Sequence, residues 1–180
     1  MEWKEELQQH TKEAEKVVQG YLPEETGHQK LLIEASNYSV LVGGKRLRPM
    51  IMLESFKAFG GTGNVVEPFM AALEMIHSGS LVHDDLPCMD NDEYRRGNLT
   101  TWKKYGYDMA VLAGDKLFIY AFETAAKAFA LTDRADLVGK AISILANKAG
   151  IYGMIGGQSV DVEYTDRPVT KSQLEFIYEL

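Results

Sequence analysis

Apolar residues recur at helical spacing along nearly the whole chain of 180 residues, and no stretch alternates apolar and polar residues as a half-buried strand does. The pattern predicts helices over residues 2–20, 22–42, 50–59, 65–82, 107–131, 133–150 and 151–164, a helix start within 98–102, and a last helix that Thr170 caps with Gln173. The loops are short, which favours antiparallel neighbours around a common core. We therefore predict one all-α domain over residues 1–180.

The stretch from 65 to 82 is apolar on most faces, so its helix is expected at the centre of the fold. Gly114 interrupts another long apolar stretch. A glycine inside a helix costs about 1 kcal/mol relative to alanine, so Gly114 marks either a close approach of two helices or room for a ligand.

Charged residues crowd together directly after the central helix. They are Asp84, Asp85, Asp90, Asp92, Arg95 and Arg96. Carboxylates placed this close repel one another unless a cation shares their charge, and an all-oxygen donor set favours Mg²⁺. The two arginines that follow can grip phosphate oxygens in bidentate fashion. An exposed acidic loop is the alternative, but it leaves the arginine pair and the apolar helix as coincidences.

Asp84 and Asp90 are the predicted metal ligands of this cluster. Six positions on a continuous helix separate two side chains by about 240°, so the helix must break between them. Pro87 supplies the break, because it lacks an N–H and clashes with the carbonyl four residues back. The same geometry leaves Asp85 and Asp92 as supporting or solvent-facing groups.

The sequence GGKRLRP over residues 43–49 is a candidate phosphate site. Glycine lets a backbone approach a ligand closely, and Lys45, Arg46 and Arg48 stand at the start of a helix, where free N–H groups also favour anions. The alternative for this segment is a solvated basic turn, and the spacing alone favours neither interpretation. His77 lies seven residues before Asp84 and so shares its helix face, although a histidine at such a position is as often part of the core.

Composition narrows the function classes. Hydrophobic residues make up 46% of the chain, enough for a substantial core. A net charge of −7 argues against a nucleic-acid surface. One cysteine rules out an internal disulfide, and neither a secretory signal nor a stretch of about 18 apolar residues is evident. We expect a soluble, cytoplasmic protein with no membrane span.

Five segments in register resemble the trans-polyprenyl diphosphate synthases: GGKRLRP (43–49), EMIHSGSLVHDDLPCMDND (74–92), RRG (95–97), LAGD (112–115) and GGQSVD (156–161). The resemblance implies an antiparallel helical bundle around a deep central cavity, and a homodimer. It also implies a reaction in which an allylic diphosphate ionises with the help of Mg²⁺ and alkylates isopentenyl diphosphate. A terpene cyclase or a head-to-head condensing enzyme is similar in metal chemistry but matches these segments less well.

The resemblance also assigns roles to individual residues. It gives Asp84 and Asp90 as Mg²⁺ ligands with Asp85 in support, Gly44, Lys45, Arg48, His77 and Arg96 as the isopentenyl diphosphate site, Arg95 as the allylic diphosphate contact, and Gln158 with Asp161 as a cavity-lining pair. Asp84, Asp85, Asp90 and Arg95 are the residues that it connects most directly with catalysis.

Gly79 and Ser80, about one turn before the first aspartate, are the positions that limit the growing chain in this family. Neither side chain is large. We therefore expect a C20 product, geranylgeranyl diphosphate, slightly ahead of the C15 farnesyl product.

The family pattern normally continues with a Lys-Thr pair, a second DDxxD motif and a basic tail, and these 180 residues contain none of them. We expect a synthase that lacks its C-terminal helices and therefore half of its metal site. The alternative is a non-catalytic subunit or a diphosphate-binding fragment that assembles with a partner. The intact first motif favours the synthase.

Overall fold

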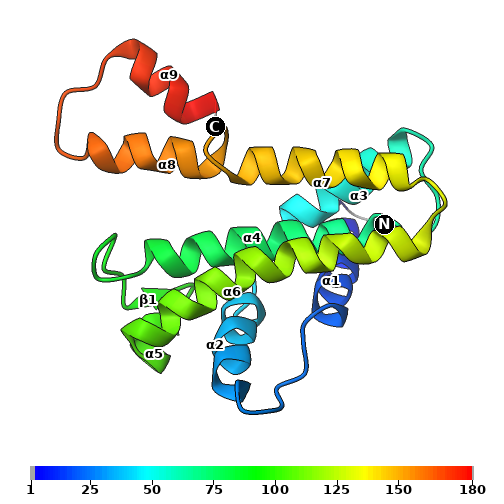
Figure 1. The fold of residues 1–180 in the computed structure, drawn as a ribbon, viewed down its shortest axis with the longest axis horizontal. Coiled ribbons are helices and arrows are strands. Elements are labelled where there is room, and N and C mark those ends of the chain that lie inside the picture. Colours follow the sequence, from blue (N-terminus) through cyan, green and yellow to red (C-terminus); the bar gives the residue numbers. More distant parts are fainter. Residues whose placement is uncertain (1–2, 180) are drawn as a thin grey trace. The chain divides into compact units, whose positions relative to one another are not determined.

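The computed structural model describes residues 3–179, which are almost entirely helical (Figure 1). The helices are α1 (Trp3–Gly20), α2 (Lys30–Leu41), α3 (Leu47–Ala58), α4 (Glu67–Asp84), α5 (Thr101–Tyr105), α6 (Tyr107–Ala126), the 3₁₀ helix η1 (Lys127–Leu131), α7 (Ala135–Ala149), α8 (Met154–Glu163) and α9 (Lys171–Glu179). Two short strands, β1 (Tyr94–Arg95) and β2 (Asn98–Leu99), stand between α4 and α5. The predicted all-α class is confirmed.

The chain divides into two compact units at the Asp133–Arg134 junction. The first unit contains α1 to η1, and the second contains α7, α8 and α9. No helix in the part that the structure describes combines the length and the apolar character needed to cross a bilayer.

The pair α4 and α6 forms the centre of the first unit, and the two helices run side by side along their length (Figure 1). Their contact face is built from small side chains, including Gly79, Ala113, Gly114 and Ala121, which lets the backbones approach closely. Leu117 and Met75 are fully buried in the same region. The prediction that the helix over 65–82 is central is therefore confirmed.

Helices α1 and α3 pack against the N-terminal half of α4. Ala14, Met50, Val66 and Met70 form a buried apolar cluster there, and Phe56 is among the partly buried side chains packed against it. The cluster thus joins α1 and α3 to α4.

One local prediction is corrected. The helix expected over 22–42 begins only at Lys30, because residues 21–29 form a loop in which Gly27 has φ 76° and Pro23 accepts a hydrogen bond from Asn37 Nδ2 at 3.0 Å. The helix start expected within 98–102 is confirmed, since α5 begins at Thr101, directly after Thr100, and β2 precedes it.

The capping box predicted for the last helix is confirmed. The backbone N–H of Gln173 donates to Thr170 Oγ1 at 3.3 Å, and the backbone N–H of Thr170 donates to Gln173 Oε1 at 2.8 Å. Two N–H groups at the start of α9 are thereby satisfied by side chains.

Candidate diphosphate and metal site

A pocket of about 340 Å³ opens in the first unit between the α2–α3 loop, α4 and the β1–β2 hairpin. It is lined by Gly44, Lys45, Arg46, Leu47, Arg48, Glu74, His77 and Arg96. All five residues that the sequence assigned to one anion site are in this set. The α2–α3 loop, α4 and the β1–β2 hairpin are far apart in the sequence, and together they bring these five residues to one pocket.

The α3 side of the pocket carries the residues of GGKRLRP. Lys45 and Arg48 are exposed there and available to an anion, whereas Arg46 is only 2% exposed. The three cations that sequence spacing grouped together are therefore separated by the fold. Arg46 is directed into the protein, and Lys45 and Arg48 remain at the surface.

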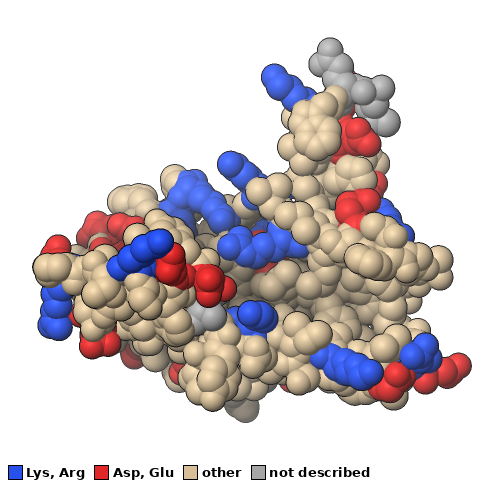
Figure 2. All heavy atoms as spheres, turned by 90° about the horizontal axis from the view of Figure 1, so that it is seen from above, with Lys and Arg blue, Asp and Glu red and all other residues tan. Residues whose placement is uncertain are grey.

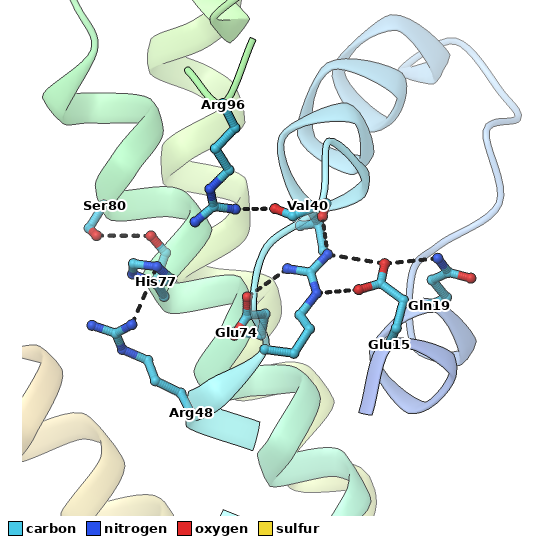
Figure 3. A network of polar contacts seen from close by, with 10 residues as sticks. Glu15, Gln19, Val40, Arg48, Glu74, His77, Ser80 and Arg96 are labelled. Atoms are coloured by element: carbon cyan, nitrogen blue, oxygen red, sulfur yellow. Dashed lines mark hydrogen bonds and ion pairs between the residues drawn. The ribbon is translucent and has the colours of Figure 1, made fainter. Parts of the chain in front are cut away.

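His77 faces the pocket from α4. Its Nε2 lies 3.5 Å from Nη1 of Arg48, and Figure 3 shows the two side chains directed toward one another. Burial lowers the pKa of His77, and the positive charge of Arg48 lowers it further, while the nearby Glu74 carboxylate acts in the opposite direction. A neutral imidazole can donate a hydrogen bond to a phosphate oxygen and can take up a proton when an anion arrives.

Arg96 reaches the pocket from the tip of a β hairpin. The hairpin pairs Arg95 with Asn98, and its two turn residues, Arg96 and Gly97, both have positive φ values of 55° and 80°. Such a tight turn carries Arg96 to the carbonyl of Gly43, to which its Nη1 donates a hydrogen bond. No strand was predicted here, because two-residue strands leave no alternating pattern.

Gly44 gives Arg96 the space that it occupies. A Cβ added to Gly44 would lie 2.6 Å from Nη1 of Arg96, closer than two such atoms can approach. We expected this glycine to allow a ligand to come close to the backbone. In the structure its missing side chain accommodates the guanidinium group of Arg96.

The predicted bend between Asp84 and Asp90 is present. Helix α4 ends at Asp84, a turn containing Pro87 follows, and the Asp90 N–H donates to the Asp84 carbonyl at 2.8 Å. Burial raises the pKa of Asp84, and the negative charge of Asp90 raises it further. The two carboxylates are therefore close enough to repel one another.

These two carboxylates suit Mg²⁺, which is commonly held by one or two carboxylates together with water and substrate phosphate. Within residues 3–179, no group of three or more His, Cys, Asp and Glu side chains is arranged to hold a metal ion.

Asp85 and Arg95 form an ion pair beside the bend. Arg95 Nη2 lies 2.6 Å and Nε 2.8 Å from Oδ1 of Asp85, whereas the exposed Asp92 carboxylate is 3.9 Å away from Nη2. The neighbouring arginines therefore serve different places, since Arg95 faces the aspartates and Arg96 faces the pocket. Asp92 lies at the rim.

Helix α6 contributes to the aspartate end through Gly114. A Cβ at Gly114 would lie 2.2 Å from Nε2 of His83, which itself is 3.1 Å from the carbonyl oxygen of Val111 and 3.7 Å from Oδ1 of Asp115. Of the two roles predicted for this glycine, the structure supports the close approach of two helices.

Gly79 packs against another helix, and its role in limiting the product chain stays a prediction. Its Cβ would meet the Cβ of Leu117 at 3.2 Å and the carbonyl oxygen of Gly114 at 3.3 Å, because Gly79 lies against α6. Ser80 is only partly buried and donates its Oγ–H to the His77 carbonyl. Ser80 also lies three residues after His77 and four before Asp84, on the face that carries both.

Gln158 and Asp161 lie on α8 in the second unit, three residues apart and on one side of the helix. Their assignment to the same cavity as the aspartates stays a prediction.

Sequence reasoning missed two carboxylates of this region, Glu15 on α1 and Glu74 on α4, which both contact Arg46. The sequence contains one feature that points to Glu74. Glu74 stands in the middle of an apolar helix, and a buried carboxylate is rare unless a cation pairs with it.

Known proteins share this architecture. A crystal structure of an FPP/GFPP synthase from Zymomonas mobilis superposes with a TM-score of 0.90 and 32% identity, covering 98% of this chain and 64% of that one. The chain is 46% identical over 146 residues to a chloroplastic geranylgeranyl pyrophosphate synthase from Capsicum annuum and 40% identical over 172 residues to a farnesyl diphosphate synthase from Geobacillus stearothermophilus.

These alignments cover 81% and 96% of this chain but only 39% and 58% of the two relatives. The chain thus spans about half the length of the curated relatives that it matches. The family model for polyprenyl synthetase matches residues 29–179, which include the pocket, the aspartate bend and the hairpin. The chain therefore belongs to the polyprenyl synthetase family.

Proposed function

We propose that the protein is a prenyltransferase that condenses isopentenyl diphosphate with an allylic diphosphate to give a short-chain trans-prenyl diphosphate. One observation carries this proposal: Gly44, Lys45, Arg48, His77 and Arg96 line a single pocket. Three permanent cations and a histidine at one opening suit a diphosphate group better than a singly charged anion. The relatives named as geranylgeranyl and farnesyl diphosphate synthases support the same reaction class.

The aspartate end is the proposed site of the allylic diphosphate. Asp84 and Asp90 would hold Mg²⁺, and Arg95 would bind a phosphate oxygen once it exchanges part of its contact with Asp85. Bound Mg²⁺ would neutralise the charge that develops on the departing diphosphate. The two anion sites then lie at different positions along α4, His77 at one and Asp84 at the other, with Ser80 on the face between them.

We propose a homodimer as the working assembly. Leu112 and Ile119 are seven residues apart on α6, hence on one face, and are 50% and 73% exposed. An exposed apolar stripe on a central helix suits burial against another chain. A relative from Arabidopsis thaliana is named as the large subunit of a heterodimeric synthase, so the identity of the second chain needs measurement.

Two finer predictions stand beside this proposal. The preference for a C20 over a C15 product no longer rests on Gly79, and Ser80 is now the residue to test. The cytoplasmic location stays a prediction, since several relatives are named as chloroplastic.

Figure 2 shows Lys and Arg side chains in separate groups, several of them beside Asp or Glu, on the face in view.

The test is incubation of the protein with Mg²⁺, isopentenyl diphosphate and each of dimethylallyl, geranyl and farnesyl diphosphate, followed by sizing of the products. We expect C15 or C20 diphosphates. Binding of isopentenyl diphosphate without turnover under any pairing, for the whole protein as the organism makes it, would contradict the synthase and support a binding subunit.

A further inference from the structure

Arg46 stands between two cations of the pocket, yet its own side chain is buried. Only 2% of the residue is exposed, while Lys45 and Arg48 on either side are both exposed. A buried guanidinium group needs partners for its charge and for its five N–H donors. The partners of Arg46 come from three different helices.

The three partner residues of Arg46 lie on three separate helices. Arg46 Nη1 lies 2.6 Å from Oε1 of Glu74 on α4, and Nη2 lies 3.1 Å from Oε1 of Glu15 on α1, whose other oxygen is close to Nε. Nη2 also donates to the backbone carbonyl of Val40 on α2. Figure 3 shows Glu15, Val40 and Glu74 converging on one point between the helices.

The backbone of Arg46 is held in an uncommon conformation by these contacts. Its φ of 49° places a residue with a side chain in the left-handed region, directly before α3 begins. Such a conformation is strained and persists only where surrounding contacts enforce it. Because Lys45 and Arg48 flank Arg46, a change of its backbone conformation would redirect both.

Glu74 joins this network to the opposite wall of the pocket. It lies one helical turn before His77 on α4, and both residues line the pocket. The contact between Arg46 and Glu74 therefore ties the start of α3, which carries Arg48, to the turn of α4 that carries His77. Nη1 of Arg48 and Nε2 of His77 lie 3.5 Å apart across the pocket.

We propose that Arg46 is a positioning residue that sets the distance between the α3 wall and the α4 wall of the diphosphate pocket, and that it does not itself bind phosphate. The inference rests on the proposed function of this pocket. Preorganised cations bind a rigid anion more tightly than mobile ones, because less side-chain freedom is lost on binding.

A purely stabilising role is the competing explanation, because removing one partner of a buried ion pair strongly destabilises a protein. The decisive variant keeps the charge. Arg46→Lys retains a cation, but one ammonium group cannot reach Glu74, Glu15 and the Val40 carbonyl in the fork geometry of a guanidinium. Leu117→Ala is the matched control, since it leaves a cavity between α4 and α6 and Leu117 is not among the residues that line the pocket.

The experiment measures the Kd for inorganic diphosphate by calorimetry in EDTA, so that no metal contributes, together with Tm for each variant. We expect Arg46→Lys to weaken diphosphate binding about ten-fold or more, as misplaced binding groups do. Leu117→Ala should keep the wild-type Kd at an equal or larger loss of Tm. Glu15→Gln, which leaves the contact with Glu74 in place, should fall between wild type and Arg46→Lys.

A second measurement reports geometry directly. The pKa of His77 depends on burial and on Arg48, Glu74, Arg96 and Arg46, and Arg46→Lys leaves all four charges in place. If the variant loosens the α3 wall, Arg48 moves away and the pKa of His77, followed by NMR, rises toward its ordinary value. Leu117→Ala should leave it unchanged.

The possible failures are distinguishable. Wild-type protein that does not bind diphosphate would overturn the proposed function of the pocket, and the positioning role with it. Wild-type binding combined with an unchanged Kd and an unchanged His77 pKa in Arg46→Lys would overturn the positioning role alone. The same holds if Leu117→Ala weakens binding as much as Arg46→Lys does.

Discussion

The backbone N–H of Asp90 donates to the carbonyl oxygen of Asp84 at 2.8 Å, across the turn that contains Pro87. This bond closes the end of α4 and holds two carboxylates within reach of one another, a geometry that a continuous helix cannot produce. Burial and the negative charge of Asp90 raise the pKa of Asp84. The arrangement leads to the first prediction.

Replacing Asp84 or Asp90 with Asn should lower kcat by about 100- to 1,000-fold, because charge stabilisation at the departing diphosphate is lost. Steady-state kinetics at saturating Mg²⁺ is the measurement, and chelation of divalent cations with EDTA should abolish turnover of the wild type. Asp92→Asn is the matched control. Its carboxylate is 55% exposed at the rim, so near-normal turnover is expected, and a loss equal to that of Asp90→Asn would refute the assignment.

Gly44→Ala should weaken binding of isopentenyl diphosphate with little effect on folding. The new Cβ would come within 2.6 Å of Nη1 of Arg96, so the guanidinium group has to leave its position beside the pocket. Losing one charge-assisted contact corresponds to about ten-fold in Kd. Calorimetry checks this, with Arg96→Met expected to reproduce the loss and the double variant to add nothing further.

Gly114→Ala should destabilise the protein by about 1–3 kcal/mol, as overpacking does, because the added Cβ collides with the ring of His83. Gly139→Ala, inside α7, is the matched control. Nothing lies within 4 Å of its Cβ, so it should gain up to about 1 kcal/mol from helix propensity. Denaturant unfolding measures both, and two variants of the same sign would contradict the packing argument.

Stability should fall as the pH is lowered below about 6.5, the ordinary pKa of histidine. The pKa of His77 is lowered in the folded state, so between that value and about 6.5 the unfolded chain binds more protons than the native one. The stabilisation that neutral His77 provides is fully present above about pH 6.5 and is lost as the pH falls through this window. His77→Gln should flatten the dependence of Tm on pH there, whereas substitution of the exposed His28 should not.

Diphosphate binding should shift the same equilibrium in the opposite direction. A bound anion favours imidazolium, so binding near pH 6.5 should take up protons. Calorimetry in two buffers of different ionisation enthalpy detects this. Binding without proton uptake would place the anion away from His77.

Product length should respond to Ser80 rather than to Gly79. Ser80 shares a face of α4 with His77 and Asp84, so Ser80→Phe is expected to shorten the products of the whole enzyme. Gly79→Ala packs against Leu117 and should change Tm without changing the product distribution. Product sizing by chromatography decides between them, and a shift caused by Gly79→Ala alone would restore the original assignment.

Much of the local structure followed from the sequence. Helical periodicity, the breaks at glycine and proline, and the capping box at Thr170 are properties of neighbouring residues, so spacing alone predicts them. The bend between Asp84 and Asp90 also follows from 3.6 residues per turn and one proline. The shared pocket of Lys45, His77 and Arg96 was expected only through the family resemblance, because no local rule links segments so far apart.

Only the tertiary structure decided which side chains face which partner. Arg46 and Arg48 are two residues apart, yet one is buried between Glu15 and Glu74 and the other faces the pocket, because the left-handed turn at Arg46 divides them. Gly79 likewise is a packing residue, because α6 lies directly against it. Sequence spacing specifies the face of a helix, but what covers that face depends on elements distant in the chain.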